Sequence, residues 1–409
     1  MSNPHKKDFP IFTNNPWLVF LDNASSTQKP SHVIDWIKSF LENSYSNIHR
    51  WAYSISERSE ELYEASKAKV KEFIWARYAS EINYTYNSTY AVNILTTSLR
   101  RSWKLVRWDK LILSIVEHHA NIVPWLILKE ELGLEIEYID VKEDFSLDLE
   151  DLKKKLDKKT KLVSLSYASN VTWSVFDLES AWEIIKSFDP NILFVVDWSQ
   201  AVPNFKVDVS KLQCDFLVFT WHKLMAETWI WVLYWKKELL KELQPWLGWG
   251  WAINWVKKDA YSPSGLPFRF EPGTPNIVWA VSLLRALEYI ESIWWYEEIE
   301  RNEKELIAHA LKRYEEISDD IKLIWSTSAK NRIWVFSFAS NSLHAWDIAE
   351  FMAERGICVR AWHHCTEPFM DFCWISWSIR MSIYLYNSKS DIDTFFEALK
   401  QYLKMERWQ

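Results

Sequence analysis

An aspartate closes one apolar run of the chain, and a lysine follows the next run. The run NILFVVD ends at Asp197, with Gln200 shortly after it, and the run DFLVFT comes just before Lys223. An aspartate at a strand end can keep a pyridinium nitrogen protonated, and a nearby lysine can form a Schiff base. Either residue alone is most often a turn or surface residue, whereas the pair favours a pyridoxal phosphate site.

These residues belong to a chain in which short apolar runs alternate with helical patterns. The stretch 58–75 carries its apolar residues largely on one face, which is typical of an amphipathic helix, and 178–188 reads as a shorter helix. Strand-like runs lie at 110–116, 160–168, 191–197, 215–220 and 229–235. Strands buried on both faces and separated by helices predict an α/β fold with a mostly parallel sheet.

Polar side chains gather where these runs end. They are Glu117, His118, His119, Asn170, Asp197, Gln200, Thr220, His222 and Lys223. In open α/β sheets, ligands bind outside the carboxyl ends of the strands. The sequence therefore predicts one binding site along that edge of the sheet.

The pattern changes after about residue 285, where long charged helices begin with stretches such as YEEIERNEKELIAHALKRYEEI. We therefore predict a large cofactor-binding domain over residues 21–290. Residues 1–20 and 291–409 are predicted to form a smaller α+β domain.

Bulk composition limits the classes of function. The net charge of −7 gives no attraction to nucleic acid or to an anionic membrane surface. No apolar run reaches the roughly 18 residues of a membrane span, and the N-terminus lacks the apolar core of a signal peptide. The four cysteines read as free thiols rather than as a disulfide framework. We expect a cytoplasmic protein with no nucleic-acid partner, no membrane contact and no metal site.

The balance between tryptophan and glycine is unusual. The 409 residues include 28 Trp and only 6 Gly, whereas glycine normally makes up about 7% of a protein. A chain of this length needs many positions with positive φ, which glycine occupies without strain. An aromatic binding surface would raise the tryptophan content, but it would not remove glycine from the turns.

Six stretches of the chain carry a family resemblance through their order and spacing: EHHANIVPW, ASNVTWSVF, VVDWSQAV, VFTWHK, RFEPGTPN and RAWHHC. The sequence resembles the group II cysteine desulfurases, the SufS-like branch of the fold-type I pyridoxal phosphate enzymes, over nearly its whole length. The resemblance implies an aminotransferase class V fold, in which a large domain holds a mostly parallel seven-stranded sheet. The smaller domain then carries a catalytic cysteine loop.

The implied activity converts L-cysteine to L-alanine and leaves a persulfide on Cys365, supplying sulfur for iron–sulfur cluster assembly. The resemblance also implies a homodimer and a sulfur-acceptor protein of the SufE or SufU type. A selenocysteine lyase acting on L-selenocysteine, or another pyridoxal phosphate-dependent lyase, would share the cofactor residues. A catalytically inactive, tryptophan-rich binding protein would explain the composition but not the presence of the catalytic set.

The resemblance assigns the cofactor residues individually. Lys223 forms the Schiff base and moves the substrate Cα proton, Asp197 pairs with the pyridine nitrogen, Gln200 bonds the ring hydroxyl, and His118 stacks on the ring face. Donors to the cofactor phosphate are Ser88, Thr89, Thr220 and His222. In the family, the residue that matches Thr274 reaches the phosphate of the partner subunit.

The substrate residues follow from the same resemblance. Asn170 and Arg380 are expected to hold the substrate carboxylate, with Arg360 nearby. Cys365 is the expected nucleophile, because the two preceding histidines and Arg360 are cationic neighbours that would favour a thiolate. The remaining cysteines, in apolar contexts, are read as structural: Cys214, Cys358 and Cys373.

Tryptophan stands at many positions where the family favours glycine. These are Trp51, Trp75, Trp173, Trp198, Trp221, Trp229, Trp231, Trp235, Trp279, Trp334 and Trp362. By contrast, Trp125 and Trp246 stand where the family itself carries an aromatic residue. Because UGA encodes Gly in some bacterial codes and Trp in others, we interpret these tryptophans as mistranslated glycines.

Two departures from the family pattern are not explained by recoding. Asn87 replaces a glycine in the phosphate turn, and we expect the turn to survive because Asn tolerates positive φ. Ala226 and Glu227 lie in the stretch LMAETW after the lysine, where the family usually has Tyr, Gly and Pro.

Overall fold

The computed structural model describes residues 3–49, 53–228, 230–248, 250, 252–293, 295–324, 332–340 and 342–407. Two of the proposed glycine positions, Trp51 and Trp229, lie outside these residues. Within this part of the chain, no helix is both long and apolar enough to cross a membrane.

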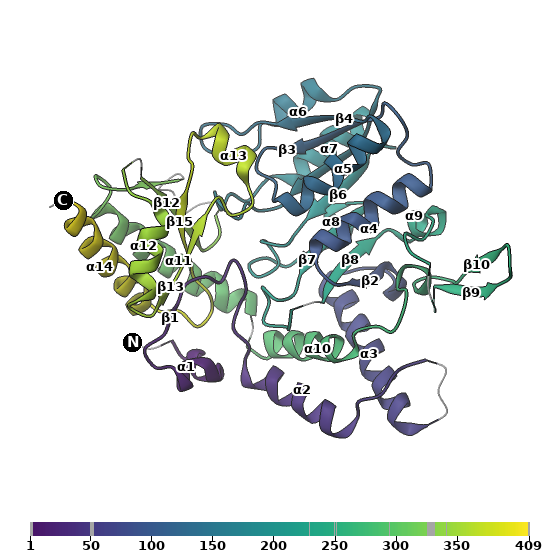
Figure 1. The fold of residues 1–409 in the computed structure, drawn as a ribbon, viewed down its shortest axis with the longest axis horizontal. Coiled ribbons are helices and arrows are strands. Elements are labelled where there is room, and N and C mark those ends of the chain that lie inside the picture. The colour runs from purple at the N-terminus through teal and green to yellow at the C-terminus, as the bar shows by residue number, and fades with distance from the viewer. Residues whose placement is uncertain are drawn as a thin grey trace.

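A seven-stranded sheet forms the centre of the molecule (Figure 1), with strand order β2-β8-β7-β6-β5-β3-β4. β8 runs antiparallel to both of its neighbours, and the other pairs are parallel. The predicted α/β fold with a mostly parallel sheet is confirmed. The strands are β2 (Ile82–Thr85), β3 (Lys110–Ser114), β4 (Glu135–Ile139), β5 (Thr160–Ser166), β6 (Leu193–Asp197), β7 (Phe216–Thr220) and β8 (Trp231–Trp235).

Helices cover both faces of this sheet, which explains why β3 and β7 are buried along their whole length. One apolar core contains side chains of α4 and α5, and the other contains side chains of α3, α7 and α10. Strands buried on both faces need apolar residues at every position, and this need produces the continuous apolar runs of the sequence. The helices are α2 (Ser31–Asn43), α3 (Ser54–Phe73), α4 (Ser88–Arg101), α5 (Val123–Leu132), α6 (Leu149–Lys155), α7 (Leu178–Phe188), α8 (Val209–Leu212), α9 (Lys237–Glu242) and α10 (Ile277–Ser292).

A four-stranded antiparallel sheet lies in the C-terminal part of the chain, with strand order β11-β12-β15-β14. The N-terminal strand β1 (Val19–Phe20) pairs with β13 (Ile357–Cys358), so an N-terminal segment joins the C-terminal part of the chain there. The predicted domain boundaries remain a prediction. The elements of this part are α1 (Pro10–Asn14), α11 (Trp295–Glu315), β11 (Lys322–Leu323), β12 (Val335–Ala339), α12 (Ala345–Ala353), β14 (Arg360–Trp362), α13 (Glu367–Phe372), β15 (Ser378–Ser382) and α14 (Lys389–Glu406).

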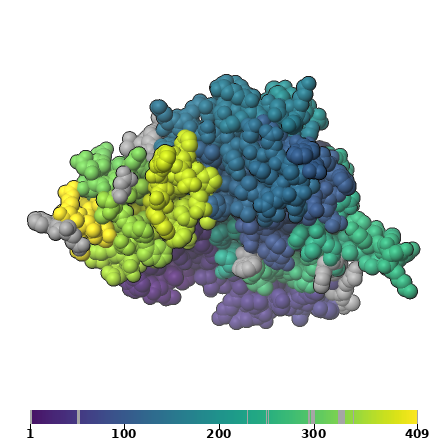
Figure 2. Space-filling view, turned by 45° about the horizontal axis from the view of Figure 1, so that its top comes forward, coloured from purple at the N-terminus to yellow at the C-terminus, as the bar shows by residue number. Residues whose placement is uncertain are grey.

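The segment around α13 packs directly against the central sheet region, as the yellow-green atoms beside the blue ones show in Figure 2. In Figure 1, the hairpin of β9 (Ile253–Val256) and β10 (Tyr261–Pro263) projects from the opposite side of the molecule. The contact at α13 brings the loop before that helix to the carboxyl ends of the central strands.

Three helices end on a tryptophan in the left-handed region of backbone conformation. Trp75, Trp103 and Trp374 have φ values of 57°, 58° and 57°. In each case the amide of the following residue bonds a carbonyl five residues back, as in Ala76 N to Lys71 O at 2.9 Å. This hydrogen-bond pattern is the Schellman motif, whose left-handed position is usually glycine. Gly133 occupies a left-handed position after α5, with φ of 64°.

Candidate active site

A pocket of about 1020 Å³ opens where the central strands end and the α13 segment packs against them. Every predicted site residue except Thr274 lines it. They are Ser88, Thr89, His118, Asn170, Asp197, Gln200, Thr220, His222, Lys223, Arg360, Cys365 and Arg380. The predicted convergence at the carboxyl edge of the sheet is therefore what the structure shows.

The lysine and the aspartate meet in this pocket because β6 and β7 are neighbours. Burial lowers the pKa of Lys223 to about 8, although the nearby Asp197 carboxylate opposes this shift. Asp197 is buried, and burial raises its pKa even though its carboxylate accepts the Ser199 amide at 2.8 Å. A cationic partner, such as a protonated ring nitrogen, stabilises the charged form of a buried carboxylate of this kind.

The turn that carries Lys223 is held by a segment near the N-terminus, which the sequence reading missed. The carbonyl oxygen of His222 accepts the Thr27 amide at 3.0 Å and the Thr27 hydroxyl at 3.1 Å. The same hydroxyl accepts the Met225 amide at 2.9 Å, where Met225 has a φ of 65°. No local signal could reveal this contact, because the partners lie almost 200 residues apart.

Two histidines of the pocket are neutral near pH 7. Burial and the adjacent Lys223 lower the pKa of His118 to about 3, and the same causes lower the pKa of His222 to about 3. His118 accepts the Ala120 amide at its Nδ1 atom, at 3.1 Å. A neutral imidazole can stack on an aromatic ring without placing a second positive charge beside Lys223.

Glu117 fixes the turn that presents His118. Its buried carboxylate accepts hydrogen bonds from Ser114 at 2.5 Å, from Asn121 at 2.8 Å and from the Ser166 amide at 2.9 Å. Burial raises the pKa of Glu117 to about 7 against these hydrogen bonds. The ends of β3 and β5 are joined through this one carboxyl group.

The N-terminus of α4 faces the pocket with Ser88 and Thr89 in its first turn. Asn87 caps this helix by accepting the Tyr90 amide at 2.7 Å. Its φ is −168°, so the tolerance of Asn for positive φ is not used in this turn; the residue acts as an N-cap in extended conformation. Free amides at a helix N-terminus favour an anion such as a phosphate.

Several buried polar atoms of the pocket have no hydrogen-bond partner among the described residues. They include the Thr220 hydroxyl and the Nε atom of Arg380. Buried polar groups normally have partners. The unpaired Thr220 hydroxyl and the α4 N-terminus fit a phosphate, and Asp197 with Lys223 fits the ring of pyridoxal phosphate.

Arg380 of β15 is buried and lies beside Asn170. Its NH1 group donates to the Asn170 carbonyl at 3.2 Å, and its NH2 group donates to Ser25 at 2.9 Å. The Asn170 side chain donates to the His364 carbonyl at 2.6 Å and accepts the Thr366 hydroxyl at 3.0 Å. The Asn170 amide therefore holds the cysteine loop here, and its contact with a substrate carboxylate remains a prediction.

Cys365 lies in the loop between β14 and α13, and it is the exposed one of the four cysteines. His364 and Cys365 both adopt left-handed conformations, with φ values of 53° and 58°. The Cys365 carbonyl accepts the His119 amide at 2.8 Å, which ties the loop to the His118 turn. Burial raises the pKa of the other three thiols, to about 11 for Cys373.

The charges around Cys365 differ from those expected. Burial lowers the pKa of His364 well below its usual value, so this histidine is not a cation, and that part of the prediction is wrong. Arg360 already pairs with Asp22, with a shortest N–O distance of 3.0 Å. The buried Arg380 lines the same pocket as Cys365.

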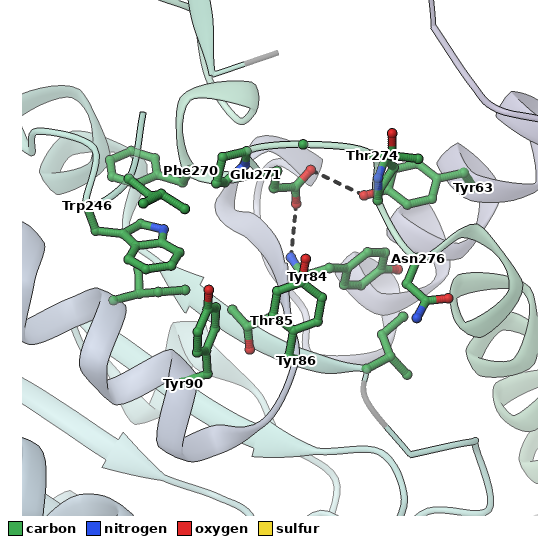
Figure 3. Close-up of a pocket in the computed structure, with 16 residues that line it drawn as sticks. Tyr63, Tyr84, Thr85, Tyr86, Tyr90, Trp246, Phe270, Glu271, Thr274 and Asn276 are labelled. Carbon is green, nitrogen blue, oxygen red and sulfur yellow. Dashed lines mark hydrogen bonds between the residues drawn. The ribbon is translucent and has the colours of Figure 1, made fainter. Parts of the chain in front are cut away.

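Thr274 is exposed and lies in a second pocket of about 610 Å³ (Figure 3). Aromatic side chains line much of this pocket. The Glu271 carboxylate also lines it and accepts hydrogen bonds from the Tyr84 amide at 2.9 Å and from the Tyr63 hydroxyl at 3.3 Å. The structure does not bring Thr274 to Lys223 within one chain.

Residues 19–395 match the aminotransferase class-V family. The chain is 36% identical to a probable cysteine desulfurase of Synechocystis sp., over 97% of this chain and 94% of that protein. It is 33% identical to a cysteine desulfurase of Cronobacter sakazakii, over 96% of both. The chain belongs to the cysteine desulfurases.

Solved structures agree with this membership. The apo cysteine desulfurase of Thermococcus onnurineus superposes with a TM-score of 0.92 at 32% identity, covering 99% of both chains. The cysteine desulfurase CsdA of Escherichia coli, in an S-sulfonic acid form, gives a TM-score of 0.88 at 28% identity over 98% of both chains. The fold-type I architecture predicted for this desulfurase is thereby confirmed.

Proposed function

We propose that the protein uses pyridoxal phosphate to convert L-cysteine to L-alanine, leaving a persulfide on Cys365. The observation that carries this proposal is the shared pocket: the exposed thiol of Cys365 opens onto the same space as Lys223, Asp197 and Arg380. A lyase that only eliminates sulfur needs no protein thiol there. The sequence RAWHHC around Cys365 supports the group II assignment.

Each residue has a physical task in this reaction. Bound pyridoxal phosphate withdraws electrons from the substrate Cα and makes its proton acidic. Arg380 offers its unpaired Nε atom and its charge to the substrate carboxylate. Lys223, with a pKa lowered to about 8 by burial, can hold the Cα proton and return it near neutral pH. Asp197 keeps the ring nitrogen protonated.

The sulfur transfer itself belongs to Cys365. Its thiolate bonds to the sulfur of the substrate while the bond between that sulfur and Cβ breaks, and the electron pair of the broken bond stays with the carbon. A proton then completes the methyl group of alanine. Because Cys365 is exposed, an acceptor protein of the SufE or SufU type could collect the sulfur from it.

We further infer a homodimer and a reducing compartment such as the cytoplasm. The exposed position of Thr274, outside the pocket of Lys223, supports a contact with the phosphate site of a partner subunit. Four free cysteines suit a compartment that keeps thiols reduced.

The test replaces Cys365 by Ala and measures alanine released from L-cysteine. We expect the variant to keep its bound cofactor and to lose alanine production. The matched control Cys358→Ala removes a half-buried thiol outside the pocket and should retain the parent rate. Alanine formation at the parent rate in the Cys365 variant would assign a direct lyase instead.

We also infer that many of the tryptophans are glycines in the native protein. Trp75, Trp103 and Trp374 occupy left-handed positions in Schellman motifs, which supports glycine at each. The buried indole nitrogens of Trp173, Trp182, Trp198, Trp221, Trp231, Trp235, Trp246 and Trp334 have no hydrogen-bond partner among the described residues.

Trp125, which the family also carries, behaves differently. Its indole donates to Asn121 at 3.3 Å. Trp246 stands at an aromatic position of the family and nevertheless has an unpaired indole, so an unpaired nitrogen alone does not identify a recoded position. Intact mass of the natively expressed protein decides the question: recoding predicts a mass below 48.9 kDa, and a mass that accounts for all 28 Trp would exclude it.

A further inference from the structure

A carboxylate lies against the loop that carries Cys365. Glu367 begins α13, two residues after the thiol, and its side chain is half exposed. One oxygen of its carboxylate lies 3.3 Å from Nε2 of His119, and the other lies 3.4 Å from Nε2 of His363. The Glu367 amide also donates to Nε2 of His119, at 3.3 Å. One residue therefore joins a histidine that follows β3 to a histidine of the loop itself.

These contacts close a ring of interactions around the thiol. The His119 amide donates to the Cys365 carbonyl at 2.8 Å, so the first link of the ring is a backbone hydrogen bond. The carboxylate of Glu367 connects His119 to His363, which precedes the thiol by two residues in the chain. The loop is thus held before and after Cys365.

The loop needs this support because its backbone is strained at two consecutive residues. His364 and Cys365 have φ values of 53° and 58°. Residues other than glycine keep a left-handed conformation only where the surrounding contacts impose it. Asn170 supplies one such contact by donating to the His364 carbonyl at 2.6 Å. The carboxylate of Glu367 supplies another, through the two histidines that it contacts.

We propose that Glu367 is a positioning residue for sulfur transfer, because its carboxylate holds the Cys365 thiol at the cofactor pocket through these two histidines. The inference rests on the proposed function, in which Cys365 takes the sulfur. The thiolate bonds to the substrate sulfur while the bond from that sulfur to Cβ breaks and its electron pair stays with Cβ. The thiolate must therefore approach along the line of the breaking bond. A loop that moves away from the pocket loses this alignment, although Arg380 still binds the substrate carboxylate.

The first test replaces Glu367 by Gln, which keeps the size of the side chain and removes its charge. Alanine formation from L-cysteine is measured in the cofactor-loaded protein. The kcat should fall about threefold to fivefold, the scale of an exposed ion-pair contact. The KM for L-cysteine and the absorbance of the bound cofactor should stay unchanged, because the substrate and cofactor contacts of the pocket remain.

The second measurement follows the thiol in the absence of L-cysteine. In Glu367→Gln, a polymer-linked maleimide should alkylate Cys365 about threefold to fivefold faster, because the released loop spends more time away from the pocket. The peptide that contains Cys365 is identified by mass. Sulfur transfer and alkylation then change in opposite directions, whereas a change in the intrinsic reactivity of the thiol would move both rates together.

Two controls show whether the histidine contacts are the cause. Asp371→Asn removes an exposed carboxylate from the same helix and should leave both rates at the parent values. In a protein that already carries His119→Gln and His363→Gln, adding Glu367→Gln should change neither rate further, because the partners of the carboxylate are gone.

The proposal is overturned if Glu367→Gln leaves kcat or the alkylation rate at the parent value, raises KM instead, or shifts both rates in the same direction. An effect of the same size without the two histidines would overturn it as well. Alkylation requires neither L-cysteine nor sulfur transfer, so it separates this role from the proposed function. If Cys365→Ala still releases alanine at the parent rate, the proposed function fails, and the alkylation rates still decide whether Glu367 holds the loop.

Discussion

Replacing Trp374 by Gly should stabilise the protein, although the change deletes the largest side chain. Trp374 is 93% exposed, so little packing is lost, and its φ of 57° places it in the left-handed region. A left-handed conformation costs a non-glycine residue roughly 1–2 kcal/mol. The greater freedom of glycine in the unfolded chain destabilises the folded state by about 0.5–1 kcal/mol and so offsets part of this gain. The net gain is about 0.5–1 kcal/mol in the free energy of unfolding.

The same substitution at the other two Schellman positions extends the effect. Trp75 and Trp103 are 66% and 82% exposed and follow α3 and α4 with the same hydrogen-bond pattern. Because the three helix ends are separate sites, their contributions should add, to about 1.5–3 kcal/mol for the triple variant. Urea unfolding followed by far-ultraviolet circular dichroism measures this change, since fluorescence would be altered by the lost indoles.

A matched control gives the opposite sign. Trp346 is 53% exposed and lies in the first turn of α12 without a positive φ, so glycine relieves no strain there, and its greater freedom in the unfolded chain lowers the free energy of unfolding by up to about 1 kcal/mol. Trp346→Gly should therefore lower the urea midpoint while Trp374→Gly raises it. If Trp346→Gly and Trp374→Gly both lower the urea midpoint, left-handed strain at Trp374 is refuted. The structural support for glycine at these helix ends would then be lost as well.

Three further predictions concern the cofactor pocket. The rate at which added pyridoxal phosphate develops the absorbance band of a Schiff base should rise with pH and level off above about 8, because the neutral Lys223 amine is the nucleophile and burial lowers its pKa to about 8. Lys223→Ala should not develop this band, and a rate independent of pH would contradict the prediction. Burial raises the pKa of Glu117 to about 7 from 4.5, so between these pH values the folded protein keeps a proton that the unfolded chain releases. The free energy of unfolding should therefore fall by about 3 kcal/mol as the pH rises from 4.5 to 7. Glu117→Gln should lack this loss in urea unfolding at pH 5 and pH 8, and an equal loss in both proteins would count against it. Thr220→Val should weaken cofactor binding about tenfold and Thr220→Ser should not, because the unpaired hydroxyl is the proposed phosphate donor; equal affinities would exclude that role.

The sequence predicted the sheet because strands covered by helices on both faces are apolar at every position. It predicted the pocket because polar residues at the ends of parallel strands share one edge, as Asp197 and Lys223 do. Among the tryptophans proposed to be glycines, Trp75, Trp173 and Trp362 have positive φ. Trp198, Trp221 and Trp231 do not, and glycine at all of these positions remains a prediction.

Contacts between distant parts of the chain could not be predicted. Asp22 and Arg360 lie 338 residues apart in the sequence, so neither residue carries a local sign of the ion pair that changes the charge beside Cys365. Trp103 and Trp374 were not among the proposed glycine positions, because they lie outside the motifs and their left-handed conformation depends on where α4 and α13 end. The neutral state of His364 follows from burial, which its neighbours in the sequence do not reveal.

The most direct measurement of the central claim is the mass of the peptide that contains Cys365 after the protein has met L-cysteine without an acceptor. We predict one added sulfur atom on that peptide, sensitive to reducing agent, and none on the peptides of Cys214, Cys358 or Cys373, whose pKa values burial raises. Alanine formed without added sulfur on Cys365, or with the sulfur on another cysteine, would contradict a desulfurase mechanism that uses this thiol.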